Sequence, residues 1–234
     1  MKKVFLIIGI VVLVIIGIIA YYVITDLQQE EKFITEITEI VESSNSQDLD
    51  IEALRERLNT TKTRGDYAVL ERAAKQYFLD VLDNNTELQE VLSSSNWANI
   101  LQAENYAVDG PDFVNTKKYI SETKTKLEEG KDKYIEFLTE EKMMSYIADK
   151  NLDSYYTDLY KQYFVGEEDN SQDIALMEQS INSIIAFLDN ADEVIDFLIE
   201  NKGKWNINGD RILFDNEDLT NEYADLLTKV TEGL

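Results

Sequence analysis

The chain has 234 residues, of which 22 are basic and 46 acidic, so its net charge at pH 7 is −24. A surface this acidic repels phosphate backbones, and we expect no nucleic-acid partner. The sequence contains neither cysteine nor histidine, which excludes disulfides, zinc sites built on those residues, and Cys–His or Ser–His catalysis. It carries no motif for a catalytic centre, a cofactor or a metal, and we predict none.

An uncharged run covers residues 4–24 and follows Lys2 and Lys3. As a helix it would be about 31 Å long, which matches the hydrocarbon thickness of a bilayer. The core of a cleaved signal peptide is usually about 7–15 residues long and ends at small residues, whereas Ile18 stands where one of these would be. We therefore expect an uncleaved signal-anchor, with a cleaved signal peptide as the alternative. The basic residues before the run predict that residues 1–3 are cytoplasmic and that the rest of the chain is extracytoplasmic.

Beyond the predicted anchor, apolar residues recur at intervals of three and four, which is the pattern of amphipathic helices. Residues 25–47 are expected to form a helical stalk and linker, and residues 48–234 an acidic helical domain. Within that domain Asp50 should cap a short helix, and an apolar stripe that begins with Tyr67 and Leu70 predicts the next helix. Helix-breaking residues at 83–85 (Asp-Asn-Asn) predict an interruption, and those at 108–112, which include the chain's single proline, predict a candidate subdomain break.

A long helix is predicted over residues 113–144, with one apolar residue per heptad and a charged surface between. Glu122 with Lys126, and Glu129 with Lys133, have the i,i+4 spacing of stabilising helix pairs. One apolar position per heptad is too few for a coiled coil. We therefore expect a helix with a narrow buried seam and a solvated back.

Three further helices are predicted in the second half of the chain, the last of them over residues 219–230. The first, over residues 152–164, has an aromatic face, and the second, over residues 174–198, belongs to the core and has a kink at 189–190. The triplet Leu-Asp-Asn occurs at this kink and also at residues 82–84. Chance repetition of helix–turn–helix sequence is the preferred explanation, and an ancient duplication is the alternative.

Near the C-terminus the apolar period changes from helix to strand on both sides of residues 208–209 (Asn-Gly), the dipeptide most typical of a two-residue hairpin turn. That turn would pair Ile207 with Asp210 and Trp205 with Ile212. The predicted fold is all-α, with an N-terminal transmembrane helix, a multi-helix extracytoplasmic domain and one small C-terminal β-hairpin. Four apolar side chains should share the buried face of the hairpin: Trp205, Ile207, Ile212 and Phe214.

Two acidic segments, residues 167–173 and 215–218, carry the oxygen ligands that calcium prefers. Neither has the alternating Asp spacing and central glycine of a helix–loop–helix calcium site. Both precede predicted helices, where Asp and Asn cap free N–H groups. We expect capping at both, and the sequence leaves calcium binding open.

Aromatic side chains that stack on sugars or peptides are the remaining candidates for a binding site. The candidate ligand-binding residues are Trp97, Tyr155, Tyr156 and Tyr160. At helical spacing, a tyrosine-rich stripe more often belongs to the core, with the hydroxyls reaching its rim. Core packing is therefore the competing interpretation of the same residues.

The missing catalytic motifs and the substantial predicted core favour a non-enzymatic interaction or scaffold protein of the cell envelope, with a protein, peptide or glycan partner. The alternative is a carboxylate-based hydrolase that acts on cell-wall polysaccharide. Such an enzyme needs two carboxyl groups about 5–10 Å apart in a cleft, at least one of them buried. The identity of the partner, the organism and the oligomeric state stay open.

Overall fold

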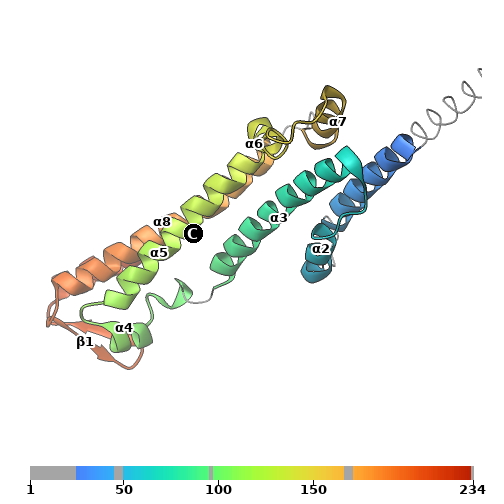
Figure 1. The fold of residues 1–234 in the computed structure, drawn as a ribbon. Coiled ribbons are helices and arrows are strands. Elements are labelled where there is room, and N and C mark those ends of the chain that lie inside the picture. Colours follow the sequence, from blue (N-terminus) through green and yellow to red (C-terminus); the bar gives the residue numbers. More distant parts are fainter. Residues whose placement is uncertain (1–24, 45–49, 95–96, 166–170, 233–234) are drawn as a thin grey trace, which may run out of the picture. The chain divides into compact units, whose positions relative to one another are not determined.

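The computed structural model describes residues 25–44, 50–94, 97–165 and 171–232 (Figure 1). These residues are mostly helical, and the strands among them form one antiparallel hairpin near the C-terminus. The predicted helical fold with a small hairpin is therefore confirmed. None of the described helices is both long enough and apolar enough to cross a membrane. The predicted anchor at residues 4–24 lies outside the described residues.

The described residues fall into two compact units. Helix α3 (Gly65–Ser93) begins in unit 1 and ends in unit 2. Residues 108–112, where the sequence predicts a candidate break, lie inside unit 2. Unit 1 comes from Met1–Val81 and Thr139–Glu167, and unit 2 from Leu82–Leu138 and Glu168–Leu234.

Unit 1 packs amphipathic helices around an apolar core. Asp50 caps α2 (Ile51–Leu58) as predicted, because its carboxylate accepts a hydrogen bond from the Ala53 N–H at 3.0 Å. The predicted apolar stripe at the start of α3 places Tyr67 and Leu70 in the core. The other helices of this unit are residues 25–44, α6 (Glu140–Ser145) and α7 (Ser154–Phe164).

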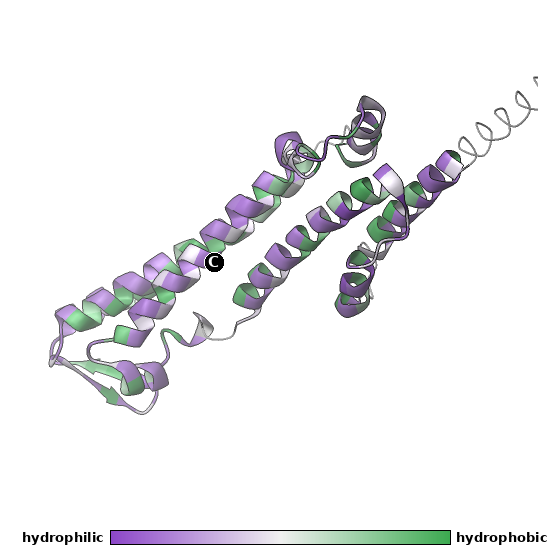
Figure 2. Cartoon of the chain, in the orientation of Figure 1, coloured by the Kyte–Doolittle hydropathy of each residue, from purple (hydrophilic) through white to green (hydrophobic). Residues whose placement is uncertain are grey.

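In unit 2, α8 (Ser171–Glu200) packs against both α5 (Val114–Phe137) and α9 (Glu217–Glu232). Figure 1 shows α5 and α8 lying side by side. In Figure 2, hydrophobic and hydrophilic bands alternate along both helices, as expected where one face of each helix is buried. The smaller elements are the 3-10 helix η1 (Trp97–Asn99), α4 (Ala103–Asp109), β1 (Trp205–Asn208) and β2 (Arg211–Phe214).

The helix interruption predicted at residues 83–85 is wrong, since α3 continues through it. α8 likewise continues through residues 189–190, where the sequence predicts a kink. Asparagine usually disfavours a helix interior because its side chain competes for nearby backbone groups. Here the Asn84 amide donates instead to the Gly130 carbonyl of α5 at 3.1 Å, and the Asn190 amide donates to the Lys229 carbonyl of α9 at 3.1 Å. The two Leu-Asp-Asn triplets thus bind a neighbouring helix in the same way.

The long helix predicted over residues 113–144 is divided in two. α5 ends at Phe137, and Thr139 caps α6, with its hydroxyl accepting a hydrogen bond from the Lys142 N–H at 3.2 Å. Threonine favours the N-cap because its side chain satisfies an N–H group that the helix leaves free.

The hairpin forms where it was predicted, but the predicted register is wrong. Ile207 pairs with Ile212, which places the turn at residues 209–210 instead of 208–209. Gly209 has a φ of 65° and is the first central residue of the turn, the position at which a type II′ turn requires glycine. Because pairing partners shift by two positions, the same four side chains remain on the half-buried face: Trp205, Ile207, Ile212 and Phe214.

Trp205 fixes the hairpin to the rest of unit 2. Its indole N–H donates to the Leu198 carbonyl at the end of α8, at 2.8 Å. Its ring stacks on the fully buried ring of Phe113, with centroids 6.1 Å apart. A half-buried aromatic ring with a satisfied N–H is the arrangement expected of a structural tryptophan.

Candidate functional site

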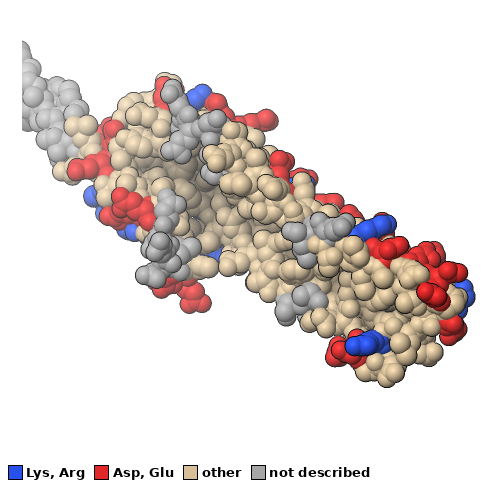
Figure 3. Space-filling model, turned by 180° about the vertical axis from the view of Figure 1, so that it is seen from behind, with Lys and Arg blue, Asp and Glu red and all other residues tan. Residues whose placement is uncertain are grey.

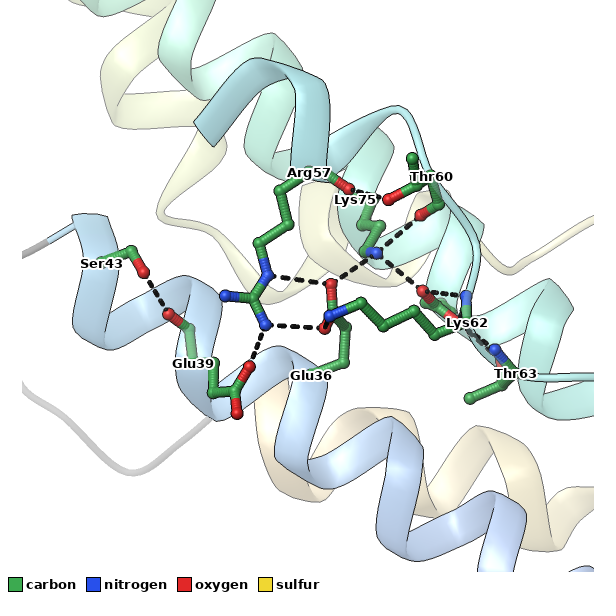
Figure 4. Close-up of polar contacts among 9 residues, drawn as sticks. Glu36, Glu39, Ser43, Arg57, Thr60, Lys62, Thr63 and Lys75 are labelled. Atoms are coloured by element: carbon green, nitrogen blue, oxygen red, sulfur yellow. Dashed lines mark hydrogen bonds and ion pairs between the residues drawn. The ribbon is translucent and has the colours of Figure 1, made fainter. Parts of the chain in front are cut away.

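A cluster of charged side chains is buried in the core of unit 1. Only 2% of Glu36, 0% of Glu71 and 2% of Lys75 are exposed to solvent. In Figure 4, Glu36 projects from the helix over residues 25–44 toward Arg57 of α2 and Lys75 of α3. Charged groups are rarely buried unless they are paired, and here Lys75 forms ion pairs with both Glu36 and Glu71.

The Lys75 ammonium group lies at the centre of this cluster. It donates to Glu36 Oε1 at 2.7 Å, to Glu71 Oε1 at 2.7 Å and to the Thr60 carbonyl at 2.6 Å. These three bonds use all three of its N–H donors. Since both carboxylate oxygens lie 2.7 Å from the same nitrogen, they are at most 5.4 Å apart.

The Glu36 carboxylate is held ionised by three basic groups. The Arg57 guanidinium binds both of its oxygens, at 3.0 Å from Nε and 2.7 Å from Nη2, and Lys62 Nζ lies 2.5 Å away. Burial by itself raises the pKa of Glu36, but hydrogen bonds from Arg57, Lys62 and Lys75 outweigh it and lower that pKa from 4.5 to about 2.

The Glu71 carboxylate is held mainly by backbone and hydroxyl donors. It accepts hydrogen bonds from the N–H groups of Lys62 and Thr63 and, at 2.7 Å, from the Thr63 hydroxyl. Burial raises the pKa of Glu71, and the hydrogen bonds from Lys75, Thr63 and Lys62 more than compensate, so the pKa lies below its usual value. The cluster therefore ties three helices and the loop before α3 into one structure.

The predicted aromatic residues of α7 lie in two different environments. Tyr160 is fully buried and stacks on Phe164 with ring centroids 4.5 Å apart, and among the described residues its hydroxyl has no hydrogen-bond partner. Tyr155 is 49% exposed, and its hydroxyl donates to Glu30. Tyr156 is half-buried and meets Tyr155 edge-on, with centroids 5.4 Å apart. Tyr155 and Tyr156 thus lie together at the surface of unit 1, and Tyr160 lies in its core.

Trp97, the fourth predicted aromatic residue, belongs to unit 2. It is half-buried and meets Phe187 edge-on, with ring centroids 5.3 Å apart. Its indole N–H donates to the Leu92 carbonyl at 3.4 Å. Ligand binding by Trp97 and the α7 tyrosines stays a prediction, and these contacts account for the packing of each ring.

Unit 2 contains a groove that sequence reasoning missed. It has a volume of about 590 Å³ and lies between the second part of α3 and α5; we call it the α3/α5 groove. Its floor is uncharged: Leu88, Val91, Ser94, Tyr119, Thr123 and Gly130. Its rim is charged, and all six rim side chains are exposed: Glu87, Glu90, Glu122, Lys126, Glu129 and Lys133.

Gly130 sets the distance between the two helices at the groove floor. A Cβ atom added at this position would lie 2.5 Å from Leu88 Cδ2 and 2.7 Å from Leu88 Cγ. Leu88 is itself only 3% exposed. The absence of a side chain at Gly130 therefore lets α3 approach α5, together with the hydrogen bond from Asn84 to the Gly130 carbonyl.

The rim charges of α5 do not form the ion pairs predicted from spacing. No ion pair joins Glu122 to Lys126 or Glu129 to Lys133, and Glu122 instead lies 3.7 Å from Lys118. Exposed i,i+4 pairs are worth only a few tenths of a kcal/mol, so solvation of the separate charges competes with them. Apart from Glu122, the rim charges of the α3/α5 groove have no ion-pair partner among the described residues and are available to a partner protein.

The acidic segment at residues 215–218 acts as a helix cap. Asn216 Oδ1 accepts a hydrogen bond from the Leu219 N–H of α9 at 2.9 Å, as the sequence predicts. Within the described ranges, no group of three or more acidic residues is placed to hold a metal ion. The other acidic segment, residues 167–173, lies mostly outside the described residues.

Comparison with known proteins found no matching family model, no similar curated protein and no similar solved structure.

Proposed function

We propose that this chain is a membrane-anchored, extracytoplasmic helical interaction protein of the cell envelope, and that unit 2 presents the α3/α5 groove to a partner. The observation that carries the proposal is the groove itself, with its uncharged floor and charged rim. Interaction sites commonly combine an apolar centre with a polar, solvated edge. The groove's volume of about 590 Å³ lies within the range of protein binding sites, roughly 300–1,000 Å³.

The uncharged run at residues 4–24 and the preceding Lys2 and Lys3 support the anchor and its orientation. Protease added outside intact cells, after removal of any wall, should digest the chain from Asp26 onward. Digestion that occurs only after lysis contradicts the proposed orientation.

The alternative function, a carboxylate-based hydrolase, requires one carboxyl group that keeps its proton near neutral pH. Glu36 and Glu71 are the buried carboxylates of the described chain, and their separation alone would suit a catalytic pair. However, their pKa values are both lowered, and the Lys75 ammonium occupies the space between them. This arrangement favours a structural role for the cluster, and hence the interaction protein.

A pull-down of the full chain from cross-linked envelopes tests the interaction directly. Ser94→Trp places a bulky ring on the groove floor without changing the charge, and Ser121→Trp places the same ring on an exposed position of α5 outside the groove. We expect the parent chain and Ser121→Trp to capture the same protein and Ser94→Trp to lose it. Equal capture by all three contradicts a role for the groove.

A further inference from the structure

The α3/α5 groove has the geometry of a binding site for a third helix. The lining positions recur every three or four residues on each helix, so each helix contributes one face. The two helices run antiparallel, because Asn84 contacts Gly130 while Ser94 lies 3.4 Å from Tyr119, hydroxyl to hydroxyl. The groove therefore runs parallel to both helix axes.

The length of the groove matches a short helix. On α5 the lining extends from Tyr119 to Lys133, which at 1.5 Å per residue is about 21 Å, or four helical turns. The floor consists of Leu88, Val91 and Ser94 on the α3 side and of Tyr119, Thr123 and Gly130 on the α5 side. This floor suits an apolar helix face, in which anchors at i, i+3, i+4 and i+7 enter a groove.

The rim specifies the charge of such a helix. Its α3 edge carries only the acidic residues Glu87 and Glu90, whereas its α5 edge alternates acidic and basic residues. Neither Glu87 nor Glu90 has an ion-pair partner among the described residues. The same holds for Glu129 on the α5 edge. Figure 3 shows that acidic side chains are also more widespread than basic ones on the face it draws.

We infer that the α3/α5 groove binds an amphipathic helix of a partner protein, with its apolar face on the groove floor and lysine or arginine residues along the edge that faces α3. This inference rests on the proposed function and specifies its partner. A second copy of the chain does not fit, because its net charge of −24 would oppose association. A basic helix complements the rim and is attracted by the field of the whole protein.

A synthetic peptide of leucine and lysine tests this chemistry on the full chain in nonionic detergent at near-physiological salt. About 18 residues are needed, because shorter isolated helices are marginal in water. The probe has a leucine face flanked by lysines, and its counterpart has glutamate in place of lysine. Fluorescence anisotropy of the labelled peptides should show binding of the lysine peptide and none of the glutamate peptide.

Charge-reversal variants distinguish the groove from general attraction. Glu87→Lys with Glu90→Lys should weaken binding of the lysine peptide about tenfold. The control, Glu52→Lys with Glu56→Lys, makes the same change of charge at exposed positions of α2 in unit 1 and should weaken it by less than about threefold, through the long-range field alone. Substitution of Lys126 by glutamate should strengthen binding.

Equal weakening by the two double variants, or no binding of the lysine peptide to the parent chain, overturns the inference. If the pull-down still captures a partner that Ser94→Trp loses, the proposed function stands and only the assigned chemistry of the partner is wrong. If the groove substitutions change neither capture in the pull-down nor binding of the lysine peptide, both the proposed function of the groove and the assigned partner are wrong.

Discussion

Substitution of Lys75 by methionine should destabilise unit 1 strongly. Methionine keeps the flexible apolar stem of lysine but carries no charge and no N–H donor. The change leaves the Thr60 carbonyl without its donor, and it leaves the Glu36 and Glu71 carboxylates facing each other without the cation between them. All three members of this triad are at least 98% buried, so water cannot replace the lost bonds.

The size of this loss of stability depends on the hydrogen-bond partners that each carboxylate retains. Removing one member of a buried ionic group usually costs about 3–5 kcal/mol, because an uncompensated charge stays buried. Glu36 retains Arg57 and Lys62, and Glu71 retains the N–H groups of Lys62 and Thr63. We therefore expect Lys75→Met to lower the free energy of unfolding by about 3 kcal/mol, near the lower end of that range.

Urea unfolding of the purified full chain, followed by far-UV circular dichroism, measures this loss. With a typical urea dependence of about 1–3 kcal/mol per M, the midpoint should fall by about 1–3 M. Lys118→Met, at a side chain that is 70% exposed, is the matched control and should change stability by less than about 0.5 kcal/mol.

A second substitution tests the physical reason for the loss. Adding Glu71→Gln to Lys75→Met removes the repulsion between the carboxylates, so the double variant should be more stable than the sum of the two single effects predicts. If Lys75→Met unfolds at the same urea concentration as the parent, the buried cluster does not stabilise unit 1.

Three further predictions concern the helix contact at Gly130, the hairpin and the ionisation of Glu36. Gly130→Ala should lower the free energy of unfolding by about 1–3 kcal/mol, despite the better helix propensity of alanine, because its Cβ would overlap Leu88. Adding Leu88→Ala to the same chain should relieve part of that overlap. If the destabilising effects of the two substitutions simply add, the close contact is contradicted. Trp205→Ala should cost about 3 kcal/mol in thermal unfolding, and an unchanged melting temperature would mean that the ring is not structural. Because the pKa of Glu36 is about 2 in the folded chain and 4.5 unperturbed, its contribution of about 3 kcal/mol is fully present above pH 4.5 and is lost as the pH falls toward 2. Glu36→Gln should therefore be less stable than the parent at pH 7 and should approach the stability of the parent near pH 2. A constant difference in the free energy of unfolding at all pH values would contradict the lowered pKa.

The helical fold was accessible from the sequence because its signals are local. The stripe that begins with Tyr67 and Leu70 repeats at the helical period, and Asp50 precedes a helix as a cap. The Asn-Gly dipeptide placed the hairpin, although the turn uses Gly209 as its first central residue and not as its second. Local patterns thus located these elements and misplaced one register.

The errors arose where a distant part of the chain decides the outcome. Asn84 looks like a helix breaker until its partner on α5 is known. Glu71 and Lys75 have the spacing of an ordinary surface pair, and nothing local shows that Glu36 completes a buried cluster with them. The rim charges of the α3/α5 groove likewise resemble the solvated back of a single helix.

Site-specific photo-cross-linking in living cells tests the central claim, that the α3/α5 groove is where a partner binds. A photoreactive residue at Glu87 lies on the rim, where it does not fill the groove, and one at Glu56 replaces an equally exposed acidic side chain of α2. We predict a single discrete adduct from position 87 and none from position 56. The same adducts from both positions, or an adduct from position 56 alone, would contradict the claim.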